Sequence, residues 1–182
     1  GLFKSGYNCS QSVVAAFADM YGFTEEQALR MSASFGGGIG RMRQTCGAAC
    51  GMFLLAGLEK GAVDGKDREG KAANYALVQE LAEEFKKRNG SMICAELLGL
   101  KKPEGSSTPE ARTEQYYAKR PCAKMVEEAA TIWAEYLEKQ QELAEISRFY
   151  DRKAKKKAVN VLYNIKITIF AAEIKSDSSL WE

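Results

Sequence analysis

Proline, the residue that most strongly interrupts helices, is almost absent from this chain. The 182 residues include only Pro103, Pro109 and Pro121. A proline inside a helix removes a backbone hydrogen bond and collides with the preceding turn, so long proline-free stretches permit long helices. Apolar residues recur every three or four positions through most of these stretches, which is the period of an amphipathic helix. The sequence therefore predicts an all-α fold, a compact bundle of about five to six helices.

Capping residues and glycines mark where the expected helices begin and end. Thr24 and Gln27 form a capping box, and Gly90 follows the end of an apolar stripe. The expected helices cover residues 9–21, 25–35, 41–58, 67–88, 92–98 and 122–137. The glycine run at 36–40 is typical of a mobile connection between two helices. The small residues at 46–51 indicate that another helix backbone approaches closely there.

The sequence pattern divides the chain into two regions. Residues 1–135 form the expected helical four-cysteine domain, and residues 136–182 form a C-terminal extension of helical or strand-like character. Five apolar residues of the extension alternate with mostly polar ones, at the period of a strand: Val161, Tyr163, Ile165, Ile167 and Ile169. A single strand is not stable alone, so we expect this segment either to pair with a partner chain or to prove helical.

The charges and the apolar runs exclude two classes of partner. The 26 basic and 24 acidic side chains leave a net charge of only +2, which argues against nucleic acid as the main partner. No apolar run approaches the roughly 18 residues that a membrane-spanning helix needs.

The chain contains no histidine. This excludes Ser-His-Asp and Cys-His catalysis, zinc held by histidine, and haem with a histidine ligand. The five cysteines are therefore the first candidates for chemistry. Because their number is odd and no secretion signal is recognisable, we expect a cytoplasmic protein with a thiol or metal function rather than a disulfide framework.

Three cysteines fall in the first turn of an expected helix. Cys9 follows the cap residue Asn8, Cys94 lies near the cap residue Ser91, and Cys122 follows Pro121. Unpaired N–H groups and a partial positive charge at a helix start favour a thiolate and lower the pKa of the thiol. Cys122 and Cys94 are the candidate attacking thiols, because each combines a helix start with expected exposure.

Three arginines lie close in sequence to these cysteines. Arg120 next to Cys122 would lower the pKa of that thiol further. Arg41 and Arg43 would act in the same way on Cys46 if their side chains turn toward it.

Cys46 and Cys50 lie four residues apart and share one face of an expected helix. Their Cβ atoms would be about 5–6 Å apart, beyond the roughly 3.5–4.5 Å of a disulfide. They could hold a metal together, or one could pair with a cysteine on another helix. Cys50 alone is best interpreted as a small packing residue.

The cysteine and glycine pattern resembles the C_GCAxxG_C_C family, small bacterial and archaeal proteins with four characteristic cysteines and a CGAxxG motif. Residues 3–13 are similar to the opening segment of the family, and residues 36–40 to its glycine-rich stretch. The central motif is Cys46-Gly47-Ala48-Ala49-Cys50-Gly51, and the third and fourth cysteines are Cys94 and Cys122. The resemblance covers about residues 1–135 and implies redox activity. It assigns no role to Cys50 or to the extension.

Two hypotheses of function follow. In the first, Cys9, Cys46, Cys94 and Cys122 gather as a zinc or iron–sulfur site, or work as thiol/disulfide pairs with an unidentified redox partner. In the second, the chain is a structural or interaction module. Its cysteines are then packing residues or a closed zinc site, and the extension drives formation of a homodimer. A small-molecule enzyme without a thiol function ranks last, because no catalytic constellation supports it.

Overall fold

The computed structural model describes residues 1–101 and 106–177. All regular secondary structure in these residues is helical, which confirms the all-α prediction. The α-helices are α1 (Cys9–Ala15), α2 (Glu25–Ser32), α3 (Gly47–Lys60), α4 (Arg68–Asn89), α5 (Cys94–Leu97), α6 (Glu114–Lys119) and α7 (Cys122–Asp177). Two short 3-10 helices, η1 (Ala18–Tyr21) and η2 (Ala33–Phe35), follow α1 and α2.

Capping boxes fix the starts of α1 and α2. The Asn8 side chain accepts a hydrogen bond from the Gln11 N–H, and the Gln11 side chain accepts one from the Asn8 N–H, each at 3.0 Å. Thr24 and Gln27 exchange the same two bonds at the start of α2, as the sequence predicts. Each box provides partners for backbone donors that a helix start would otherwise leave unpaired.

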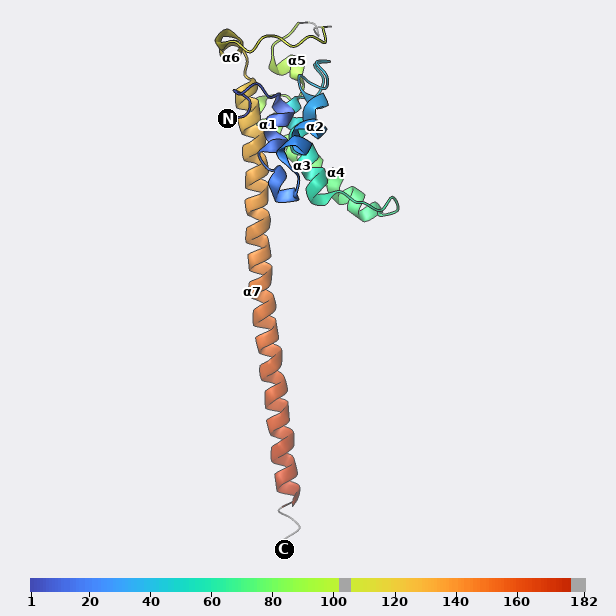
Figure 1. Ribbon diagram of the computed structural model, residues 1–182. Coiled ribbons are helices and arrows are strands. Elements are labelled where there is room, and N and C mark those ends of the chain that lie inside the picture. Colours follow the sequence, from blue (N-terminus) through green and yellow to red (C-terminus); the bar gives the residue numbers. More distant parts are fainter. Residues whose placement is uncertain (102–105, 178–182) are drawn as a thin grey trace. The chain divides into compact units, whose positions relative to one another are not determined.

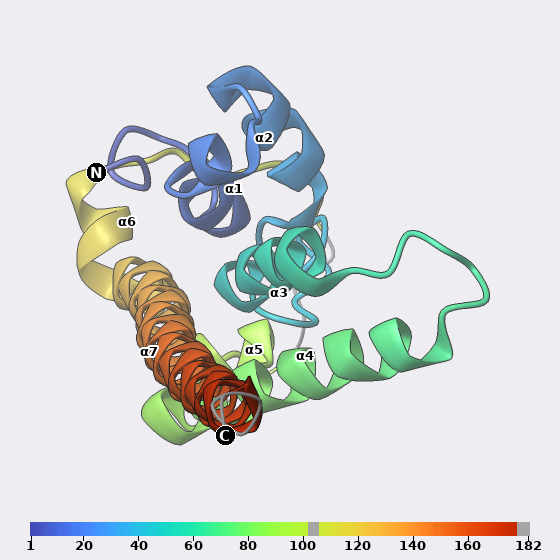
Figure 2. The ribbon, with the colours of Figure 1, turned by 90° about the horizontal axis from the view of Figure 1, so that it is seen from below.

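Helix α3 lies between α1 and α4 and contacts both of them (Figures 1 and 2). Its small residues permit the contact with α1, as the sequence predicts. A Cβ atom placed on Gly51 would lie 2.9 Å from the Cβ of Val13 and 3.0 Å from the Ser10 carbonyl oxygen. The N-terminal part of α7 adds Met125, Ala129, Ile132 and Trp133 to the buried core.

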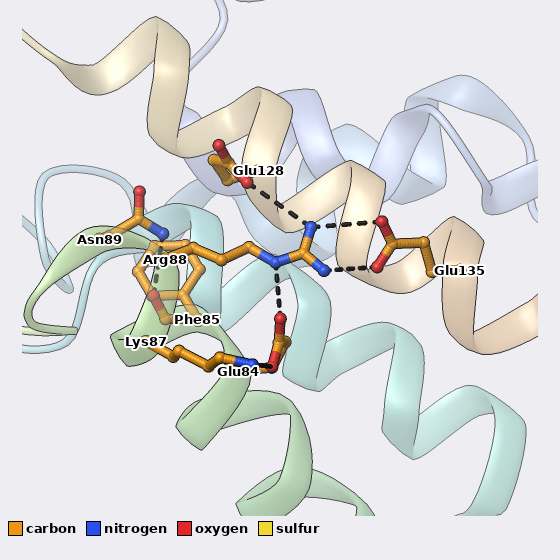
Figure 3. Close-up of polar contacts among 7 residues, drawn as sticks. All are labelled: Glu84, Phe85, Lys87, Arg88, Asn89, Glu128 and Glu135. Carbon is orange, nitrogen blue, oxygen red and sulfur yellow. Dashed lines mark hydrogen bonds and ion pairs between the residues drawn. The ribbon is translucent and has the colours of Figure 1, made fainter.

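Arg88 joins the end of α4 to the same N-terminal part of α7 (Figure 3). Its Nε donates to a carboxylate oxygen of Glu84 at 2.8 Å, and its two Nη atoms donate to the two oxygens of Glu135. Glu128 adds a third carboxylate, 3.7 Å from Nη1. Paired hydrogen bonds from a guanidinium to one carboxylate fix geometry as well as adding energy, so this cluster orients the helix that begins at Cys122.

The expected start of the third helix is wrong. Helix α3 begins at Gly47 rather than at Arg41, because the preceding segment contains left-handed residues that no right-handed helix accommodates. The backbone angle φ is 61° at Ile39, 66° at Arg41 and 60° at Arg43. The sequence leaves residues 161–169 open between a paired strand and a helix, and the structure shows a helix that belongs to α7. Its alternating apolar residues include a set spaced four apart, so the same pattern also fits a helix.

The contacts within the chain separate it into two units, Gly1–Glu135 and Tyr136–Glu182. The first unit contains α1 to α6 and the beginning of α7, and the second contains the rest of α7. In the described part of the chain, none of the helices combines the length and the apolarity needed to cross a membrane.

Candidate functional site

Four of the five cysteines line one cavity in the first unit. Cys9, Cys46, Cys94 and Cys122 all contribute to its wall, whereas Cys50 does not. The cavity has a volume of about 40 Å³. Since one water needs roughly 10–15 Å³ of such space, the cavity has room for a few waters or for the reacting atoms of a ligand, and not for a large cofactor.

Each of these four cysteines stands at the start of a helix. Cys9, Cys94 and Cys122 are the first residues of α1, α5 and α7, so the predicted placement is confirmed. Cys46 is the residue that precedes α3. The sequence pattern does not predict this placement, because the expected third helix begins six residues too early.

A short antiparallel bridge between Thr45 and Ile93 brings Cys46 and Cys94 to the same place. The Cys46 N–H donates to the Met92 carbonyl oxygen at 2.7 Å, and the Cys94 N–H donates to the Gln44 carbonyl oxygen at 2.6 Å. These bonds fix two helix starts that lie 48 residues apart in the sequence. No local sequence pattern indicates such a pairing.

The glycine run 36–40 packs tightly between the cysteine-bearing segments instead of forming a loose connection. A Cβ atom on Gly38 would lie 2.6 Å from the Cβ of Cys94, and one on Gly36 would lie 2.5 Å from the side-chain carbon Cγ of Asn8. Gly38 also adopts a φ of +74°, which other residues rarely adopt. Two residues of the run, Gly37 and Gly38, form part of the wall of the cavity.

Cys122 is the cysteine best prepared to react. Its pKa is lowered to about 7, first because its sulfur accepts a hydrogen bond from the Cys9 thiol and then because Arg120, Arg112 and Arg43 are close. Burial opposes this shift but does not overcome it. Cys122 is also half-buried, whereas the other four cysteines are buried.

The other thiols are held in their protonated form. The hydrogen bond to Cys122, followed by burial, raises the pKa of Cys9 well above its usual value. Burial raises the pKa of Cys46 to about 12 and that of Cys50 to about 11. Burial also raises the pKa of Cys94, against a hydrogen bond from Arg43. The expectation of a lowered pKa at each helix start is therefore wrong for Cys9, where the hydrogen bond to Cys122 raises the pKa most, and for Cys94, where burial raises it most.

The arginines divide between the cavity and its surroundings. Arg120 acts on Cys122, as predicted, while Arg43 turns toward Cys94 and Cys122 rather than toward Cys46. Arg41 lies outside the cavity, and its Nε donates to the Ser106 carbonyl oxygen at 2.9 Å.

Arg112 also lines the cavity, although the sequence analysis did not single it out. Its guanidinium lies 4.8 Å from the ring centres of both Phe3 and Tyr116. Its Nη2 donates to the Tyr7 carbonyl oxygen at 3.4 Å. These partners come from the opening segment and from α6, which explains why no local pattern pointed to this residue.

The cysteines were also expected as ligands of a zinc ion or an iron–sulfur cluster. Among the residues that the structure describes, no three Cys, Asp or Glu side chains are placed so that they could hold one metal ion. All five cysteines are free thiols, and those of Cys9 and Cys122 are in hydrogen-bond contact.

Among the comparisons with known proteins, one finds a match, and it covers the cavity cysteines. No curated protein and no solved structure shows significant similarity to the chain. Residues 7–136, which contain all four cavity cysteines, match the model of a family described as "Putative redox-active protein (C_GCAxxG_C_C)". The chain therefore belongs to the C_GCAxxG_C_C family.

Proposed function

We propose that this protein is a dithiol redox protein in which Cys122 attacks a disulfide and Cys9 resolves the resulting intermediate. The observation that carries the proposal is the contact between these two thiols, one half-buried with a pKa of about 7 and the other buried and protonated. A thiolate, not a thiol, is the attacking species in disulfide exchange. Cys122 is therefore the attacking residue, and Cys9 is the resolving residue that reacts in the second step.

The first step forms a mixed disulfide. The Cys122 thiolate attacks one sulfur of the substrate disulfide, a new S–S bond forms, and the old S–S bond breaks. The second substrate sulfur leaves with the bonding electron pair and takes a proton from solvent. A nucleophile whose pKa lies near the ambient pH suits this step, because it is substantially ionised and still strongly nucleophilic.

The second step closes an internal disulfide between Cys9 and Cys122. Once Cys122 carries the substrate sulfur it is uncharged, so the two contributions it makes to the high pKa of Cys9 are lost. Cys9 then gives up its proton more readily, attacks the Cys122 sulfur and releases the second substrate thiol. In total two protein thiols are oxidised and one disulfide is reduced to two thiols, with two electrons transferred.

Cys94 and Cys46 have supporting roles in this proposal. Cys94 accepts a hydrogen bond from Arg43, which holds this guanidinium near Cys122. Cys46 has a pKa of about 12 and stays a thiol near neutral pH.

The experiment uses the reduced full chain and the uncharged bis(2-hydroxyethyl) disulfide. We expect two thiols to be lost together and peptide mapping to find a Cys9–Cys122 disulfide. The variant Cys9→Ser should stop at a mixed disulfide on Cys122, and Cys122→Ser should not react. Cys50→Ala is the matched control, because Cys50 is buried but does not line the cavity. Oxidation that proceeds equally well in Cys122→Ser would refute the proposal.

A second candidate function, an interaction module, rests on the second unit. Leu143, Ile146 and Tyr150 are exposed large apolar residues of α7, spaced three and four residues apart. Such a stripe is the pattern that a second helix covers. The proposed occupant is a second copy of the chain, which would make the protein a homodimer without changing the chemistry at Cys122.

A further inference from the structure

The cysteine cavity is unusually rich in positive charge. Arg43, Arg112 and Arg120 line it, and the lining residues, all within the described part of the chain, include no Asp or Glu. Arg43 is only 3% exposed. Charges removed from water need an opposite charge nearby; the thiolate of Cys122 supplies one, and the partly exposed carboxylate of Glu110, which is bonded to Arg120, supplies another. The charge of the cavity therefore favours a negatively charged ligand.

Arg112 offers a hydrogen-bond donor inside this charge cluster. Its Nη1 atom is buried and has no hydrogen-bond partner among the described residues, while its Nη2 is bonded to the Tyr7 carbonyl oxygen. A buried donor without a partner costs free energy, which an acceptor on a bound ligand would recover.

A larger groove adjoins the cavity and shares Leu98, Tyr116 and Arg120 with it. The groove has a volume of about 430 Å³ and also contains Lys119. A small molecule can therefore place its reacting atoms in the cavity and the rest of its structure in the groove.

A carboxylate of the chain itself already lies where the groove meets the cavity. Glu110 accepts a hydrogen bond from Arg120 and lies 4.0 Å from an Nη of Arg41. The two guanidinium side chains are 14% and 16% exposed, whereas the Glu110 side chain is 45% exposed. The cationic side of this site is fixed and partly buried, and the carboxylate that fills it is accessible to solvent and replaceable.

We propose that the substrate of this protein is a small acidic disulfide, whose sulfur atoms reach Cys122 through the cavity and whose carboxylate replaces Glu110 on Arg120. The inference rests on the proposed thiol–disulfide exchange and names its substrate class. One acidic disulfide is consumed and two acidic thiols are released. The thiols of Cys9 and Cys122 become one disulfide, so the two electrons and the atoms balance.

Three symmetrical disulfides of similar length test this substrate class. They are 3,3′-dithiodipropionate with two negative charges, the uncharged bis(2-hydroxyethyl) disulfide, and cystamine with two positive charges. A free thiolate repels an acidic disulfide and attracts a cationic one, so a simple thiol prefers cystamine. For the reduced full chain at low salt we expect the opposite order. Dithiodipropionate should oxidise it about tenfold faster than the uncharged disulfide, and cystamine slowest.

Two variants assign the preference to the groove. Arg120→Gln should reduce the ratio of the acidic to the uncharged rate by most of that factor, and the ratio is the readout because Arg120 also affects the pKa of Cys122. Glu110→Gln should raise the rate with dithiodipropionate, because it removes the competing carboxylate. Lys124→Gln is the matched control, since Lys124 lies two residues after Cys122 in α7, is exposed and lines neither the cavity nor the groove.

The outcomes separate the inference from the proposed function. If none of the three disulfides oxidises Cys122, the proposed exchange itself is refuted. If all three react in the order shown by free cysteine, exchange stands and the acidic substrate is refuted. If Arg120→Gln fails to fold, Glu110→Gln still decides, because an unchanged rate with dithiodipropionate in that variant contradicts the proposed replacement of Glu110.

Discussion

The thiol of Cys122 is half-buried, and the other four cysteine side chains are buried. Its pKa of about 7, against the ordinary value of 9.0, predicts that alkylation by iodoacetamide rises with pH around a midpoint near 7. The thiolate fraction should be about one tenth at pH 6 and about nine tenths at pH 8. Cys46 and Cys50, with pKa values of about 12 and 11, should stay unmodified in the same folded sample. Mass spectrometry of the alkylated peptides at each pH measures all of these.

The cause of the low pKa of Cys122 can be tested through its partner. The largest contribution is the hydrogen bond from Cys9, so Cys9→Ala should move the midpoint of Cys122 alkylation to higher pH. Cys50→Ala, which removes a buried thiol outside the cavity, should leave it unchanged. This account would be contradicted if the midpoint of Cys122 alkylation were near pH 9 in the unsubstituted chain. It would also be contradicted if Cys9→Ala left that midpoint unchanged.

At the scale of residues, the sequence predicts the placement of the cysteines at helix starts better than it predicts the pKa values of their thiols. Asn8 and Pro121 identify helix starts, so the placement of Cys9 and Cys122 could be predicted from neighbours in the chain. Which of the thiols ionises could not, because the answer depends on burial and on Arg112, whose contacts come from residues far away in sequence.

At the scale of elements, the contact between α1 and α3 depends on Gly51. Its substitution by alanine would place a methyl group 2.9 Å from Val13 and 3.0 Å from a backbone oxygen of Ser10, neither of which can move cheaply. We predict that Gly51→Ala destabilises the protein by about 1–3 kcal/mol. Urea unfolding followed by circular dichroism measures the change.

The same helix supplies the control for that variant. Gly57 has open space where a Cβ would lie, so Gly57→Ala should stabilise the protein by about 0.5–1 kcal/mol through helix propensity alone. If the two substitutions changed the stability equally, the close approach of α1 would not be the reason for a glycine at position 51.

The prediction of helix boundaries is wrong where tertiary contacts outweigh the local conformational preference of the residues. The small residues at 46–51 correctly indicated a close helix contact, since glycine and alanine report directly on the space available. The start of α3 was wrong because Ile39, Arg41 and Arg43 adopt left-handed conformations that are supported by backbone bonds such as that from the Arg43 N–H to the Gly37 carbonyl oxygen. Isoleucine and arginine rarely adopt a left-handed conformation, so the residue types do not predict it here.

At the scale of the whole molecule, the cysteine cavity and the exposed apolar stripe belong to different parts of the chain. The cavity lies within residues 7–136 that match the family, whereas Leu143, Ile146 and Tyr150 lie beyond them. A helix that exposes such side chains to water gains free energy when a second helix covers them, by roughly 1.5–3 kcal/mol for each fully buried residue. We therefore predict that the full chain forms a homodimer through this stripe.

The variant Leu143→Lys/Ile146→Lys tests this prediction, because it places charges in the stripe on both copies. We expect the dissociation constant to rise by at least about a hundredfold, since four apolar contacts are lost. Gln141→Lys/Ala144→Lys adds the same charge at exposed positions of the same helix that lie away from the stripe, and it should leave the dimer intact. Sedimentation equilibrium over a range of concentrations measures both. A monomeric unsubstituted chain would remove the interaction candidate, and the oxidation of Cys9 and Cys122 should be the same in both variants because their thiols lie in the other unit.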